Sequence, residues 1–152
     1  ANLGMFFVTL AVAIFGIYQF LTTQRLTRSQ TAKEIYADYL KFSFENPRFA
    51  DPSLARVDYV EKTFDESGEL FGKYEWFVSY MIMAYEEIYF LSDEPSWANT
   101  MRENLANHAR YFASDHFERS GYFSHIDGPL ASQIREVSEV MRRSLPIPGS
   151  NG

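Results

Sequence analysis

The stretch Leu3–Leu21, LGMFFVTLAVAIFGIYQFL, decides the fold class of this chain because nearly all of its side chains are apolar. No side chain in the first 24 residues is charged at neutral pH, and only Thr9 and Gln19 are clearly polar within the stretch. At a rise of about 1.5 Å per residue, a helix of this length is about 28 Å long, close to the ~30 Å hydrocarbon thickness of a bilayer. The sequence therefore predicts a transmembrane anchor over residues 1–24.

The anchor is expected to present its large apolar side chains to lipid. These are Leu3, Phe6, Phe7, Leu10, Ile14, Phe15, Ile17 and Leu21. Tyr18 and Phe20, near the end of the stretch, suit the membrane interface, where aromatic rings collect. A secretory signal is disfavoured because its positive charge would precede the apolar residues. A buried helix of a soluble core is disfavoured because such helices usually keep a polar stripe.

Basic side chains follow the anchor directly. Arg25, Arg28 and Lys33 are the juxtamembrane bases, and residues 25–44 hold four basic and two acidic side chains. Because loops rich in Lys and Arg stay in the cytoplasm, we expect a short external amino terminus and a cytoplasmic carboxyl-terminal domain. This places the anchor in the inner (cytoplasmic) membrane. The chain has no cysteine, which agrees with a reducing compartment.

The body of the chain is acidic, in contrast to the residues beside the anchor. Beyond residue 44 there are 10 basic and 18 acidic side chains. Such a body is repelled by nucleic acid, and it contains no basic stripe with interleaved aromatic residues. The expected partners are therefore the lipid bilayer and other membrane protein subunits, with no nucleic acid.

Two helices are predicted on the amino-terminal side of the body. No Gly or Pro separates Leu21 from Phe44, so the anchor should continue as a juxtamembrane helix over residues 25–45, ended by Asn46-Pro47. Its buried face would hold Ala32, Ile35, Tyr39 and Phe42. A shorter helix is predicted from about Pro52 to Phe64. Its inward residues would be Leu54, Val57, Val60 or Tyr59, and Phe64.

The central helix is predicted over Leu70–Leu91, LFGKYEWFVSYMIMAYEEIYFL. An unbroken four-three spacing runs through Leu70, Tyr74, Phe77, Met81, Ala84, Ile88 and Leu91. The other faces are also apolar, and the uncharged run from Trp76 to Tyr85 is too short to cross a bilayer. Two interpretations stay open: neighbouring helices surround this segment, or one face is kept for a partner. The candidate partner-binding residues are Trp76, Tyr80, Met83 and Tyr85.

Two more helices complete the predicted domain. Asp93-Glu94-Pro95 is typical of a helix start, and the third helix would bury one apolar face. That face holds Trp97, Met101, Leu105, Ala109 and Phe112. The last helix would bury Leu130, Ile134, Val137 and Met141. The predicted fold is all-α, with a single transmembrane helix continuing into a small up-and-down bundle over residues 46–145 and a disordered tail over 146–152.

Catalytic motifs are missing from the sequence. The chain has three histidines, but none is preceded three residues earlier by the glutamate typical of carboxylate-bridged metal sites. No His-Glu-x-x-His motif, phosphate loop or dinucleotide fingerprint occurs, and Asp115-His116 near Ser114 and Ser120 lacks the nucleophile elbow of a triad enzyme. Convergence of Glu86 and Glu87 with His108, Asp115 and His116 in space stays open. We expect a non-catalytic protein without a cofactor.

Several phrases of the sequence resemble a group of uncharacterised short bacterial membrane proteins. They are Phe44-Glu45-Asn46-Pro47 with Ala50, Tyr74-Glu75-Trp76-Phe77-Val78-Ser79-Tyr80, Glu86-Glu87-Ile88, Trp97, and His108-Ala109-Arg110-Tyr111-Phe112. The resemblance implies a bacterial origin and the architecture of one amino-terminal span followed by a small helical domain. It transfers no catalytic residue.

Two classes of function follow from these patterns. The first is an accessory or scaffold subunit of a larger bacterial membrane complex, such as a respiratory or photosynthetic assembly. Such a subunit would hold its partners through the span and through the aromatic central helix. The second is a membrane-anchored sensor or signalling protein whose helical domain binds a small ligand or a soluble partner.

Overall fold

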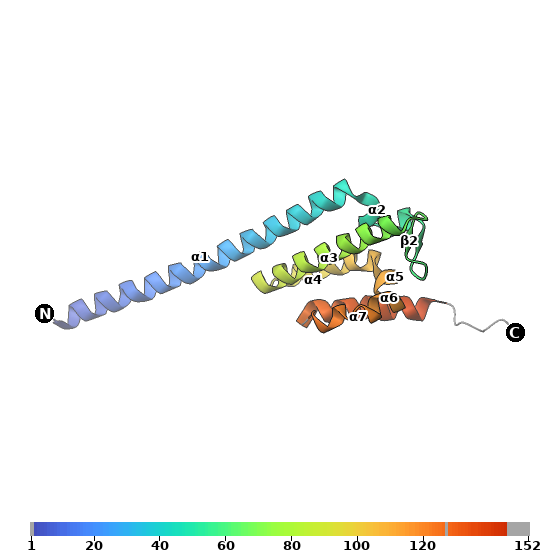
Figure 1. Ribbon diagram of the computed structural model, residues 1–152. Helices are drawn as coiled ribbons and strands as arrows, with labels where there is room; N and C mark the ends of the chain where they lie inside the picture. Colours follow the sequence, from blue (N-terminus) through green and yellow to red (C-terminus); the bar gives the residue numbers. More distant parts are fainter. Residues whose placement is uncertain (1, 127, 146–152) are drawn as a thin grey trace.

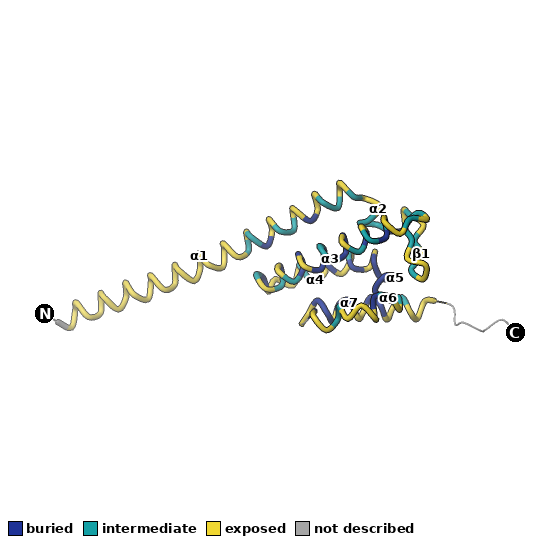
Figure 2. The backbone as a smooth tube through the Cα atoms, in the orientation of Figure 1, coloured by how far each residue is buried: buried dark blue, intermediate teal, exposed yellow. Residues whose placement is uncertain are grey.

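The computed structural model describes residues 2–126 and 128–145, and its fold is all-α with one short hairpin (Figure 1). The predicted disordered tail, residues 146–152, lies outside the described residues. The amino-terminal helix α1, Asn2–Glu45, is one uninterrupted rod, as the lack of Gly and Pro before Asn46 predicts. Its second half lies against a small helical body, while its first half projects away from that body (Figures 1 and 2).

Helix α3, Gly68–Leu91, forms the centre of the body and runs antiparallel to α1 (Figure 1). The Ser67 side chain caps its first turn by accepting a hydrogen bond from the Leu70 backbone N–H. The predicted four-three spacing is confirmed, because its five central members are buried and its two end members are partly buried. The predicted face of α1 is also confirmed, with Ala32 and Tyr39 buried.

Aromatic rings join α1 to α3. The Phe42 ring stacks on Phe77 with centroids 5.2 Å apart and meets Tyr80 edge-on at 4.9 Å. Closer to the first half of α1, Tyr39 meets Tyr85 edge-on at 5.2 Å. Edge-on and offset ring pairs add about 0.5–1.5 kcal/mol each beyond their buried area. These contacts hold the body along the second half of α1.

The helix predicted from Pro52 to Phe64 is wrong. This segment follows the short helix α2, Pro47–Ala50, and consists of the 3-10 turn η1, Pro52–Leu54, and the hairpin strands β1, Val57–Asp58, and β2, Thr63–Phe64. Only Phe64 of the expected inward residues is fully buried, whereas Leu54 and Val60 are exposed.

Turn chemistry explains this error. The Asp58 carboxylate accepts hydrogen bonds from the backbone N–H groups of Val60 and Glu61, which closes a turn instead of a helix. Lys62, within the predicted helix, has a positive φ angle of 55°, whereas a right-handed α-helix requires a negative φ. The apolar spacing matched a helical period, but the local polar groups decided the backbone.

The carboxyl-terminal half folds into α4, Pro95–Asn107, α5, Ala109–Phe112, α6, Asp115–Arg119, the 3-10 turn η2, Tyr122–Ser124, and α7, Gly128–Ser144. The single third helix predicted through Phe112 is therefore interrupted at His108, where φ is −103° and ψ is 10°. The predicted apolar face survives the interruption, because Met101, Leu105, Ala109 and Phe112 are buried.

Helix α7 lies beside α4 and closes the body (Figure 1). The Gln133 side chain donates to the Ala98 carbonyl at 2.8 Å and accepts from the Tyr89 hydroxyl at 2.8 Å. These two hydrogen bonds connect α7 to α4 and α3. Losing either partner would leave a buried polar group unpaired, which carries a desolvation penalty. The core therefore extends from the second half of α1 through α3 to α7.

Candidate functional site

The first half of α1 is uncovered. All eight predicted lipid-facing side chains are exposed, with Leu3 at 73% and Phe15 at 60% of their accessible surface. Within the described residues, α1 is the one helix that is long and apolar enough to cross a membrane, and no part of its most apolar window is buried. By its length and composition, this uncovered helix could span a membrane.

The three juxtamembrane bases lie where the body begins. Arg25 and Lys33 are exposed and form no ion pair with the described residues. Arg28 instead contacts the carboxyl-terminal end of α3, where its guanidinium donates to the Phe90 carbonyl at 2.5 Å and lies 5.6 Å from the centre of the Phe90 ring. Ser29 donates to Glu94 just after that end, at 3.4 Å. These contacts position the end of α3 close to the end of the apolar stretch of α1.

An apolar stripe lies on the outer side of α3. Trp76 is 78% exposed, Met83 is 60% exposed, and the partly buried Tyr80 lies between them at helical spacing. A groove of about 500 Å³ follows these residues between α3 and η2. Its lining residues are Trp76, Ser79, Tyr80, Met83, Glu86, Tyr122, His125 and Ile126. We call Trp76, Tyr80 and Met83 the outer stripe.

Tyr85 does not belong to this surface, contrary to the sequence-based expectation. Its side chain is fully buried, and its hydroxyl accepts a hydrogen bond from the Asn104 amide at 2.8 Å. Burial raises the pKa of the Tyr85 hydroxyl far above its usual value. The central helix is thus both core and surface: α1 and α4 cover the Tyr85 face and leave the Trp76 face bare.

His108 is buried in the centre of the body. Its Nδ1 lies 3.0 Å from the Tyr74 hydroxyl oxygen, and its Nε2 has no hydrogen-bond partner among the described residues. Desolvation lowers the pKa of His108 to about 3, although Asp51 acts in the opposite direction. A neutral, fully buried imidazole without access to solvent is suited to packing and not to proton transfer.

His116 pairs with Glu75, a carboxylate that sequence reasoning did not single out. His116 Nε2 lies 2.5 Å from Glu75 Oε1, and the Tyr111 hydroxyl donates to the same oxygen at 3.1 Å. The two nearby serines are engaged locally. Ser114 Oγ accepts from the Phe117 N–H as the cap of α6, and Ser120 Oγ donates to the Phe117 carbonyl. No triad geometry results, and the pair links α3 to α6.

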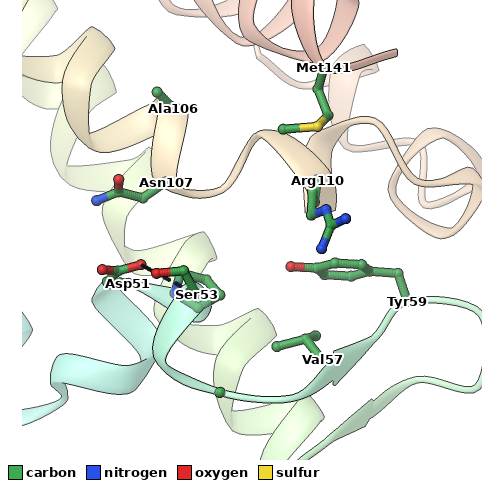
Figure 3. Close-up of a pocket in the computed structure, with 10 residues that line it drawn as sticks. Asp51, Ser53, Val57, Tyr59, Ala106, Asn107, Arg110 and Met141 are labelled. Carbon is green, nitrogen blue, oxygen red and sulfur yellow. Dashed lines mark hydrogen bonds between the residues drawn. The ribbon is translucent and has the colours of Figure 1, made fainter. Parts of the chain in front are cut away.

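A cavity of about 530 Å³ opens between η1, β1, α4, α5 and α7. Figure 3 shows the Arg110 guanidinium directed toward the Tyr59 ring, with Asn107 and the bonded Asp51–Ser53 pair on another wall. The other lining residues are Pro52, Ala55, Val57, Ala106 and Met141. Arg110 forms no ion pair with any described carboxylate. The cavity therefore holds an unpaired guanidinium together with the Asp51 carboxylate, other polar groups and apolar side chains.

Metal-ligating residues are not gathered at any of these places. Across residues 2–126 and 128–145, no group of three or more His, Cys, Asp or Glu side chains is positioned to hold a metal ion. The histidines are dispersed instead, since His108 pairs with Tyr74 and His116 with Glu75.

Comparisons with known proteins do not add to this description. The chain matches no protein-family model, no curated protein and no solved structure.

Proposed function

We propose that this chain is a membrane-anchored, non-catalytic accessory or scaffold subunit of a larger bacterial membrane complex. The observation that carries the proposal is the outer stripe, where Trp76 and Met83 remain 78% and 60% exposed on the helix at the centre of the body. Aromatic and methionine side chains are enriched at protein interfaces and adapt to the shape of a partner.

The chemistry of the groove selects the kind of partner. Between Trp76 and Met83 the only polar side chain that lines the groove is Ser79, apart from the Tyr80 hydroxyl. Glu86 and His125 also line the groove, on α3 and after η2. An apolar helix or loop of a neighbouring membrane subunit fits the surface between Trp76 and Met83, because no charged side chain there would be removed from water on binding.

The anchor supports the same proposal. Lipid and apolar helices of other subunits are the environments that stabilise the uncovered first half of α1. A span without a charged residue conducts no ion by itself and relays no proton. The chain would therefore contribute binding surfaces along its length and leave chemistry to its partners.

The test is native sizing after gentle detergent extraction, with variants of the outer stripe. We expect the wild-type chain to migrate with a large assembly and Trp76→Asp or Met83→Asp to release it. Since both side chains are exposed, their substitution should change the free energy of unfolding by only about 0.5 kcal/mol. Val140→Asp on α7 is the matched control, because Val140 is 62% exposed and lies outside the groove. A wild-type monomer or homodimer would contradict the proposal.

The proposed location is the inner membrane, with the body in the cytoplasm, supported by Arg25, Arg28 and Lys33 beside the span. Because the chain lacks cysteine, a single Glu61→Cys substitution on the hairpin gives one unique label. We expect an impermeant thiol reagent to modify this cysteine only after lysis of the cells. Modification in intact cells would reverse the orientation.

The cavity around Arg110 favours a second candidate function, a sensor that binds a small anion. Its unpaired guanidinium and the Asn107 amide are the groups that would recognise a carboxylate or phosphate. Thermal shifts of the detergent-solubilised protein with inorganic phosphate or citrate test this candidate. The shift should be absent in Arg110→Gln, and no shift in the wild-type protein would remove the candidate.

A further inference from the structure

The carboxyl-terminal end of α3 lies at the level of the end of the apolar stretch. A shallow groove of about 390 Å³ is lined on α1 by Phe20, Thr23, Gln24, Thr27 and Arg28. The one lining residue from the body is Phe90. Phe20 belongs to the last turn of the stretch Leu3–Leu21, so the two aromatic rings face the same space. The body therefore reaches down along α1 to the place where the stretch ends.

The Phe90 side chain has no apolar cover in this position. It is 72% exposed, although it follows the buried Ile88 on the same helix. The Arg28 guanidinium donates to the Phe90 backbone carbonyl and lies 5.6 Å from the centre of the Phe90 ring. Arg28 therefore contacts one side of the ring. An aromatic side chain at the boundary between hydrocarbon and headgroups is stabilised there.

We propose that Phe90 inserts into the interface of the bilayer that holds α1, so that the body rests on the membrane through the end of α3. The occupant of the groove is then phospholipid, because the groove is continuous with the uncovered apolar surface of the span. Arg28 lies about 10 Å beyond Leu21 along the helix, within the headgroup layer, where a guanidinium is favourable next to phosphate.

The acidic residues after α3 indicate that the contact between the body and the bilayer is apolar and not electrostatic. Asp93 and Glu94 lie two and three residues after α3, and Glu94 accepts a hydrogen bond from Ser29, one residue further along α1 than Arg28. Acidic side chains are repelled by an anionic leaflet, so general charge attraction does not hold the body down. Insertion of the Phe90 ring holds the body on the membrane instead. Because this contact is apolar, it should persist at high salt.

The proposal depends on the proposed function only in that α1 spans the bilayer. Its test is tryptophan quenching in the full chain, reconstituted into vesicles of phosphatidylcholine and phosphatidylglycerol brominated on the acyl chains close to the headgroup. Both native tryptophans, Trp76 and Trp97, are replaced by Phe. A single tryptophan is then introduced as Phe90→Trp, with Phe15→Trp in the span and Leu54→Trp on η1, at the far end of the body, as matched controls.

We expect brominated lipid to reduce the Phe90→Trp fluorescence about two-fold, with a blue-shifted emission at low and high salt, as befits an interfacial ring. Phe15→Trp should also be quenched and Leu54→Trp not at all. Quenching of Phe15→Trp alone would overturn the docking of the body and leave the anchor intact. No quenching of either would overturn both. If the chain joined no complex in native sizing, the proposed function would fail, but the quenching of Phe90→Trp would be unaffected.

Discussion

Phe77→Ala is expected to lower the free energy of unfolding by about 3–5 kcal/mol, the range for truncation of a fully buried aromatic ring. Phe77 is 1% exposed and joins three parts of the chain. Its ring stacks on Phe42 of α1 at 5.2 Å, and its centre lies 6.2 Å from Phe49 and 6.0 Å from His108. Since the surrounding rings are rigid, they would refill the resulting cavity only in part.

The preceding residue provides the matched control. Trp76→Ala removes a larger ring from the same helix, but that ring is 78% exposed, so the loss should be about 0.5 kcal/mol or less. Urea unfolding of the detergent-solubilised chain, followed by circular dichroism, measures both variants. If Trp76→Ala lowered the free energy of unfolding as much as Phe77→Ala, the outer stripe would be covered and the exposed face of α3 would be wrongly assigned.

Lowering the pH from 6.5 to 5 is expected to destabilise the body by about 2 kcal/mol through His108 alone. Burial lowers the pKa of His108 from 6.5 to about 3 in the folded protein. Between these values the unfolded chain binds a proton that the folded chain does not, so stability falls by about 1.4 kcal/mol for each pH unit. Above pH 6.5 both states are neutral at this residue and the dependence disappears.

His108→Leu isolates this contribution. It removes the titrating group and places an apolar side chain in the same buried position, while every other ionisable group of the chain is unchanged. The wild-type chain should therefore lose more stability than the variant as the pH falls. Parallel pH profiles would contradict a neutral, buried His108. The measurement is urea unfolding at successive pH values.

Much of the fold could be predicted because helical periodicity is local. The spacing of Tyr74, Phe77 and Met81 predicts one apolar helix face, and this face is buried. The prediction does not require knowing which elements cover that face. The end of α1 followed from Asn46-Pro47, and the start of α4 from Pro95. The hairpin between β1 and β2 was missed since its turn depends on the Asp58 carboxylate and on the positive φ of Lys62, neither of which apolar spacing predicts.

The candidate surfaces were less predictable, because they depend on partners distant in the sequence. Trp76 and Tyr85 belong to one uncharged run, yet Asn104 and Tyr39 cover Tyr85 while nothing comparable covers Trp76. Glu75 meets His116 across 41 positions, and Arg28 meets Phe90 across 62. No motif joins these residues, so only folding brings them together.

The sequence by itself determined an apolar helix long enough for a bilayer and a helical body behind it, because both depend on composition and on spacing within a single segment. The tertiary structure decided which face of α3 stays bare, that burial lowers the pKa of His108, and that Phe90 and Phe20 line one groove. The physical reason is that burial and desolvation are set by the neighbours around a side chain, and here those neighbours come from other helices.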